Sequence, residues 1–128
     1  METTASPQPT AGVESLNGLH WVGILAAVVS AAVHLLLGVR MIPSALGISF
    51  VLAGFGFVGG VVLLVRGYRR RTLYGVGIAF TLVQIVLWYV VNFAGGGRSF
   101  PADVGMLGAV DKVAQVVLVA VLAVLLRR

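Results

Sequence analysis

The sequence predicts an all-α integral membrane protein in which four helices form one bundle. Of its 128 residues, 59% are hydrophobic and 10% are charged, with a mean hydropathy of +1.06. This is more apolar surface than a soluble domain of one-domain length can bury. The apolar residues also fall into four long runs, and most basic residues stand between or after the runs. Lipid is therefore expected to cover the helices.

The chain divides into a short polar tail and a helical domain. Residues 1–17 contain two prolines and several Ser and Thr residues, so we expect a disordered tail. A cleaved signal peptide is disfavoured because no basic segment precedes the first apolar run. The domain occupies residues 18–128, and each of its runs is close to the ~20 residues that a helix needs to cross ~30 Å of hydrocarbon. The expected spans are about 19–39, 45–65, 73–94 and 106–126.

Local signals separate these spans. Pro43 is expected to end the first helix, and Ser44 is placed to cap the second. The second and third spans are joined by a short basic turn, whereas a loop rich in glycine follows the third span. The first two helices should therefore form a tight hairpin.

Basic residues are unevenly divided between the two ends of the bundle. One end carries Arg66, Arg69, Arg70, Arg71, Arg127 and Arg128, and the other carries Arg40 and Arg98. The positive-inside rule then predicts that both termini are cytoplasmic in a multi-pass cell-membrane protein. Because the basic residues lie at helix ends, we expect Arg66, Arg69, Arg70 and Arg71 to contact anionic lipid headgroups, and we expect no nucleic-acid partner.

The two outer turns resemble each other in sequence. Residues 38–47 and 96–105 share Gly, Arg, Pro and Gly at a constant offset of 58 residues, and the same offset relates Arg69 and Arg70 to Arg127 and Arg128. This pattern indicates two duplicated helical hairpins in parallel orientation. The alternative is that two outer turns need the same residue types independently.

Small residues suggest how the first hairpin packs. Close backbone approach favours packing between helices in lipid, where no hydrophobic force drives them together. The first span has such a series at Gly23, Ala27, Ser30 and His34, and the second has one at Ser49, Ala53, Gly56 and Gly60. We expect the two series to meet, with a homodimer contact as the alternative use of the second.

Polar residues within the spans mark a candidate site in the outer half of the bundle. Its members come from the first, third and fourth spans: His34, Gln84, Trp88, Asn92, Asp111 and Gln115. Ionisable groups inside a span are costly, and His34 with Asp111 is the natural pair. One interpretation is an outward-facing polar pocket for a quinone headgroup, a proton or a small solute. The other is that these residues only bond across helices, with Asp111 and Lys112 forming a solvated helix start and the lysine stem reaching outward.

Motifs for chemistry are missing from the sequence. It has no cysteine, no second histidine pair for haem, and no GxSxG, HExxH or P-loop motif. We therefore expect no metal, no cofactor and no enzymatic activity. The favoured function is an accessory or interaction subunit of a membrane complex, with a membrane-protein partner or a second copy of the chain. A small-solute or proton transporter and a quinone-linked redox subunit are the alternatives.

The size, the two-hairpin layout and the Leu-Trp-Tyr-Val-Val-Asn-Phe run at 87–93 carry a resemblance. In these features the chain resembles small uncharacterised four-helix membrane proteins of halophilic archaea and, more distantly, the DoxX-like group. The resemblance implies a membrane location and no established activity.

Overall fold

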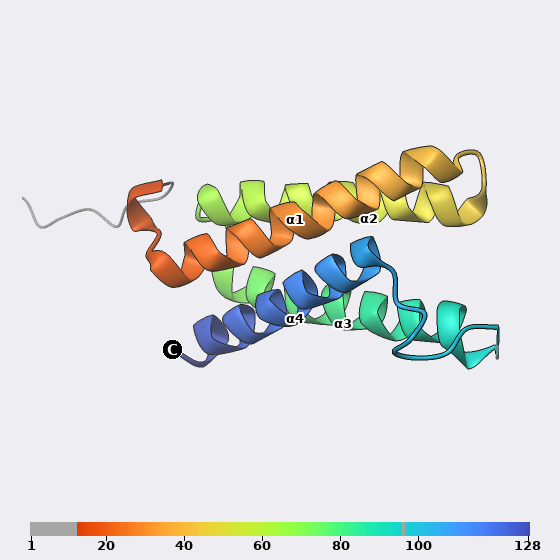
Figure 1. Ribbon diagram of the computed structural model, residues 1–128. Coiled ribbons are helices and arrows are strands. Elements are labelled where there is room, and N and C mark those ends of the chain that lie inside the picture. The colour runs from red at the N-terminus through yellow and green to blue at the C-terminus, as the bar shows by residue number, and fades with distance from the viewer. Residues whose placement is uncertain (1–12, 96) are drawn as a thin grey trace, which may run out of the picture.

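The computed structural model describes residues 13–95 and 97–128, which fold into an up-and-down bundle of four long helices (Figure 1). The helices are α1 (Gly18–Met41), α2 (Ala45–Val65), α3 (Arg70–Tyr89) and α4 (Met106–Arg127), with a short 3-10 helix η1 (Val13–Ser15) before α1 and a π-helix η2 (Val90–Ala94) that continues α3. All four are long and apolar enough to cross a membrane. The predicted all-α class with four span-length helices is confirmed. With η2 counted as the end of α3, the helices begin and end within about one turn of the expected residues.

The helix ends follow from local signals in the sequence. The Asn17 side chain caps α1, and the side chain of His20 accepts a hydrogen bond from the Asn17 backbone in return. Ser44 caps α2 as predicted, with its hydroxyl 3.0 Å from the Gly47 nitrogen. The α2–α3 turn needs a left-handed backbone at Gly67, where φ is 72°. These caps satisfy backbone donors that a helix start otherwise leaves unpaired.

Ordered structure begins before the expected end of the tail. Residues 1–12 of the predicted disordered tail lie outside the described residues. Of the rest, Val13–Ser15 form η1, and the Ser15 hydroxyl lies 2.6 Å from a guanidinium nitrogen of Arg70, which donates to it. The segment just before α1 is thereby tied to the start of α3.

The four helices pack in a ring with one weak side. α1 packs against both α2 and α4, and α3 packs against α4, whereas α2 and α3 touch sparsely. The buried core consists mainly of α1 and α4 side chains, including Ala27, Leu118 and Val121. Figure 1 shows both outer turns at one end and the α2–α3 turn with the C-terminus at the other. The bundle is therefore closed tightly everywhere except between α2 and α3.

The predicted meeting of two small-residue series is wrong. The backbones of α1 and α2 instead approach at other glycines: a Cβ on Gly47 would lie 2.6 Å from the Met41 carbonyl carbon, and one on Gly54 would lie 2.6 Å from Leu35. Gly23 faces Val121 of α4, and Gly56 faces the ring of Phe80 on α3. The closest approach lies near the short Pro43 turn, which holds the two helices together, so the glycines there are the ones that the contact requires.

Candidate functional site

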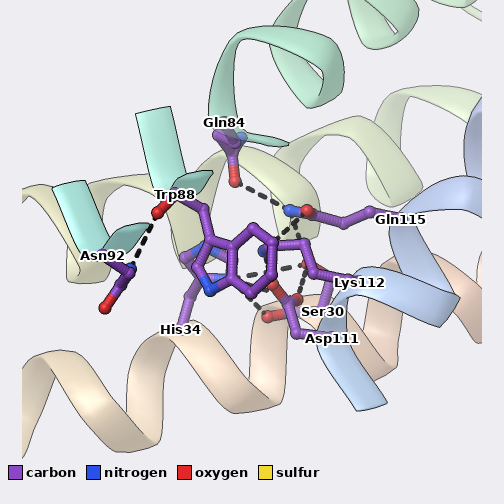
Figure 2. Close-up of polar contacts among 8 residues, drawn as sticks. All are labelled: Ser30, His34, Gln84, Trp88, Asn92, Asp111, Lys112 and Gln115. Atoms are coloured by element: carbon purple, nitrogen blue, oxygen red, sulfur yellow. Dashed lines mark hydrogen bonds and ion pairs between the residues drawn. The ribbon is translucent and has the colours of Figure 1, made fainter. Parts of the chain in front are cut away.

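The predicted polar residues lie near the end of the bundle that contains the α1–α2 and α3–α4 turns, which is called the outer end below after the predicted orientation, and two further residues join them (Figure 2). Asp111 lies at the centre and is only 3% exposed. One of its carboxylate oxygens accepts a hydrogen bond from the Ser30 hydroxyl of α1 at 2.5 Å. The other accepts from the ammonium group of Lys112. Asp111 is thus a buried carboxylate with a countercharge and a neutral donor, which is the condition under which a charge is tolerated away from water.

Lys112 differs from the expectation that its stem reaches outward. Its ammonium turns inward, where it donates to Asp111 and to the Gln115 side-chain oxygen at 2.8 Å. It also lies 5.2 Å from the centre of the Trp88 ring, within cation–π range. The physical reason is the buried carboxylate: leaving Asp111 without a countercharge costs more than holding the lysine stem inward.

The ammonium of Lys112 also fixes the orientation of both glutamine amides. Since Lys112 can only donate, the atom of Gln115 that it contacts is the oxygen. The amide nitrogen of Gln115 then donates to the Ser30 hydroxyl at 3.4 Å and to the Gln84 side-chain oxygen at 3.2 Å. The nitrogen of Gln84, Nε2, is buried and has no hydrogen-bond partner among the described residues.

His34 lies on the same network through one ring nitrogen. Its Nδ1 donates to the backbone carbonyl of Ser30 at 2.8 Å and lies 3.6 Å from Asp111 Oδ1. A carbonyl oxygen only accepts, so the proton of the neutral ring is on Nδ1. Nε2 makes no hydrogen bond to any residue that the structure describes. The expected pairing of His34 with Asp111 is thus present as a contact in which Ser30 is the common neighbour.

Trp88 and Asn92 lie beside this network, but neither is hydrogen-bonded to it. The Asn92 amide nitrogen donates to the Trp88 carbonyl at 2.8 Å, and its oxygen accepts from Arg98 at 3.1 Å. Asn92 lies in η2, where the wider π-helical turn changes the backbone hydrogen bonding. Single π-helical turns within α-helices often occur at functional sites.

A cavity of about 620 Å³ lies between the helices at this end. Five of the six predicted residues line it: His34 from α1, Gln84 and Trp88 from α3, Asn92 from η2, and Asp111 from α4. Gln115 lies behind the wall and is fully buried. Apolar side chains such as Leu37, Phe50 and Leu87 complete the lining. The volume is in the range of small-molecule sites, which combine apolar walls with a few placed polar groups.

Two residues of the network were missing from the predicted site. Ser30 was assigned to a packing series, although it is the residue that joins Asp111, Gln115 and the backbone contact of His34. Its spacing of four residues from His34 was the signal that could have found it. Lys112 was assigned to the surface because a lysine near a helix start usually reaches water.

The basic end of the bundle contains side chains that hold the protein together. Arg71 donates to the backbone carbonyls of Leu126 at 2.7 Å and Arg128 at 3.2 Å, at the C-terminal end of α4. Arg70 donates to the Leu64 carbonyl at 2.9 Å as well as to Ser15. Cations are favoured at the C-terminal end of a helix, where carbonyl groups lack partners. Arg66 and Arg69 are exposed, so their predicted contact with lipid is sterically open.

No group of three or more His, Cys, Asp or Glu side chains within the described part of the chain is arranged to hold a metal ion.

The comparison with known proteins gives a match among protein families. Neither the curated proteins nor the solved structures contain a match to this chain. The resemblance to proteins of halophilic archaea and to the DoxX-like group stays an expectation. A family model of unknown function matches residues 6–126, which is nearly the whole sequence, and the chain therefore belongs to the family of unknown function DUF7475.

Proposed function

We propose that this chain is a multi-pass protein of the cell membrane with both termini on the cytoplasmic side. The six arginines that the sequence places on one side lie at the end that contains the α2–α3 turn and the C-terminus, which supports this orientation. Exposed arginines at this end, such as Arg66 and Arg69, would contact anionic headgroups. The cavity then opens in the outer half of the membrane.

Reporter fusions test the orientation. A reporter that is active only in the cytoplasm should give signal after Arg128 and none after Gly97. The reverse pattern would contradict the proposed topology.

We further propose that the protein binds a small molecule in the outer cavity, the pocket function that the sequence left as an alternative. The observation that carries this proposal is Gln84, which lines a cavity of about 620 Å³ and whose Nε2 is a buried donor without a partner among the described residues. A buried donor left unpaired costs about 1–3 kcal/mol. A ligand with a hydrogen-bond acceptor removes that cost, and the unprotonated Nε2 of His34 can accept a hydrogen bond from a donor on the ligand. The proposal is a binding function, as in a carrier or a binding subunit, and assigns no reaction.

Protein extracted from native membranes tests the proposal directly. Mass spectrometry should find a small molecule retained in near-stoichiometric amount by the wild type. Ala53→Phe, which places a ring in the cavity wall, should lose it. Leu25→Phe is the matched control because Leu25 is 66% exposed on the outer surface of α1. Equal retention by Ala53→Phe and the wild type, or no retained molecule in either, would contradict a ligand-binding cavity.

The accessory-subunit function remains a second proposal. Gly60 of the predicted small-residue series has open space in front of it, as does its neighbour Gly59, so α2 offers a flat strip to a helix of another protein or of a second copy. Copurification from native membranes, with Gly60→Leu as the variant that should lose the partner, tests this function independently of the cavity.

A further inference from the structure

We infer that the ligand of the outer cavity is an uncharged amphiphile whose head carries a carbonyl or a similar hydrogen-bond acceptor. The ligand enters the cavity from the bilayer by passing between α2 and α3. This inference rests on the proposed binding function and adds the chemical class of the ligand and its route. It combines three observations: the charge balance of the cavity wall, the unpartnered amide of Gln84, and a second hollow that continues the cavity.

The wall carries no net charge to offer a ligand. Its charged residues are Arg98 and Lys112 against Asp103 and Asp111, two of each sign. Lys112 and Asp111 already neutralise each other, and Arg98 is hydrogen-bonded to Asn92. The other two charged residues, Arg98 and Asp103, are exposed, so water screens their charges. A net charge moved deep into the cavity therefore loses its hydration without gaining a buried, unpaired countercharge, a cost of several kcal/mol. An uncharged head is therefore favoured over an anion or a cation.

The polar group that needs a partner is a donor. Nε2 of Gln84 cannot rotate to exchange places with the oxygen without losing the bond from Gln115, whose own orientation is fixed by Lys112. The group that meets it must be an acceptor such as a ketone, quinone, ester or ether oxygen. The aromatic rings of Phe50 and Trp88 on the same wall suit a flat head.

The route follows from the weak side of the bundle. A second hollow lies between α2 and α3 and shares Ser49, Ala53 and Gln84 with the cavity. Its other lining residues are all apolar: Leu52, Val76, Ala79, Phe80 and Val83. An apolar chain can lie in this hollow without dehydration cost, whereas a polar solute cannot. Gln84 stands where the two spaces meet, so a head at Gln84 would leave its tail between the helices and toward the lipid.

Fluorescence of Trp88 in nanodiscs tests the ligand class. The full chain carries Trp21→Phe, so that Trp88 on the cavity wall is the remaining tryptophan. The probe is para-bromophenyl undecyl ketone, whose bromine quenches at short range. Its matched control is para-bromo-dodecylbenzene, which has a methylene in place of the carbonyl. Its charged counterpart is 4-bromo-2-undecylbenzoate, which has a free carboxylate on the ring. We expect saturable quenching by the ketone, about 3- to 10-fold weaker binding of the alkyl control, from the loss of one hydrogen bond, and weaker binding still of the carboxylate.

Variants assign the effect to residues. Gln84→Met, which keeps the length of the side chain but has no amide, should abolish the preference for the ketone over the alkyl control. Thr81→Val should keep that preference, because Thr81 donates to the Gly77 carbonyl of its own helix and lines neither hollow. For the route, Ala79→Phe should slow the binding of the ketone several-fold, whereas Val86→Phe, on the exposed face of α3 outside both hollows, should not.

The outcomes separate this inference from the function on which it rests. Equal affinity for ketone and alkyl probes, tighter binding of the carboxylate, or an unchanged preference in Gln84→Met would overturn the ligand class. An unchanged binding rate in Ala79→Phe would overturn the route between α2 and α3. If no probe quenches saturably although Ala53→Phe still loses a native ligand, the inferred class is wrong and the binding function stands.

Discussion

Two histidines about four turns apart on α1 lie in opposite surroundings, and the difference separates a structural polar contact from a candidate site. His20, at the basic end, has a partner at each ring nitrogen: Nε2 lies 3.0 Å from the Tyr74 hydroxyl, and Nδ1 lies 3.2 Å from the Asn17 backbone nitrogen. His34, at the outer end, uses only Nδ1, and its ring faces a cavity. Both side chains are similarly buried, at 8% and 6% exposed. Burial alone therefore does not identify the site.

What differs between the two ends is the balance of partners around the histidine. At the basic end a tyrosine, an asparagine and two arginines close the space with contacts inside the protein. At the outer end the hydrogen bonds run from Lys112 through Gln115 to Gln84 and leave one buried donor unused. A polar network that is complete rigidifies a bundle, whereas one with an unused group beside a cavity leaves room for a further hydrogen-bond partner, which the proposed ligand would supply. The predictions below test whether the two ends are in fact different in kind.

The largest expected effect is at the centre of the outer network. Asp111→Asn keeps the shape of the side chain but leaves the ammonium of Lys112 without its countercharge at a site of low exposure. Loss of one partner of a buried ion pair costs about 3–5 kcal/mol, so the free energy of unfolding in bicelles, measured by steric trapping, should fall by about that amount. Adding Lys112→Met removes the unpaired charge and should recover part of the loss. If the double variant is no more stable than Asp111→Asn, the pair is not the source of the effect.

The sequence predicted the helices well and the detailed contacts less well. The helices could be predicted from the four apolar runs, and the first hairpin from Pro43 and Ser44. This worked because helix length and helix caps are local properties of the sequence. The polar stripe on the third span and the His34–Asp111 contact could also be read from spacing. The direction in which Lys112 points could not, because it depends on a carboxylate that becomes buried only when α1 and α4 meet. Nor could the choice among many glycines, since it depends on where two helices cross.

A second prediction concerns the contact between α1 and α2 at the outer end. This contact must stay closed if the cavity opens between α2 and α3. A Cβ on Gly47 would lie 2.6 Å and 2.8 Å from the carbonyl carbon and oxygen of Met41, which are backbone atoms and cannot move aside cheaply. Gly47→Ala should therefore lower the free energy of unfolding by about 1–3 kcal/mol. Gly60→Ala, with nothing within 4 Å of the new methyl group, is the matched control and should be close to neutral. Similar stabilities of the two variants would mean that α1 and α2 do not close this side tightly.

The smallest expected effect tests the basic end. Tyr74→Phe removes only the hydroxyl that lies 3.0 Å from His20 Nε2, and the net contribution of such a hydrogen bond is about 1 kcal/mol. The same steric-trapping measurement should show this loss, while retention of the native ligand stays at the wild-type level because no atom of Tyr74 or His20 lines the cavity. Residues that share no partner contribute additively to stability, so Tyr74→Phe combined with Asp111→Asn should lose the sum of the two single effects, within about 0.5 kcal/mol. A larger deviation, or ligand loss in Tyr74→Phe comparable to that in Ala53→Phe, would mean that the two histidine sites are coupled through α1. The basic end would then belong to the binding machinery rather than to the frame that supports it.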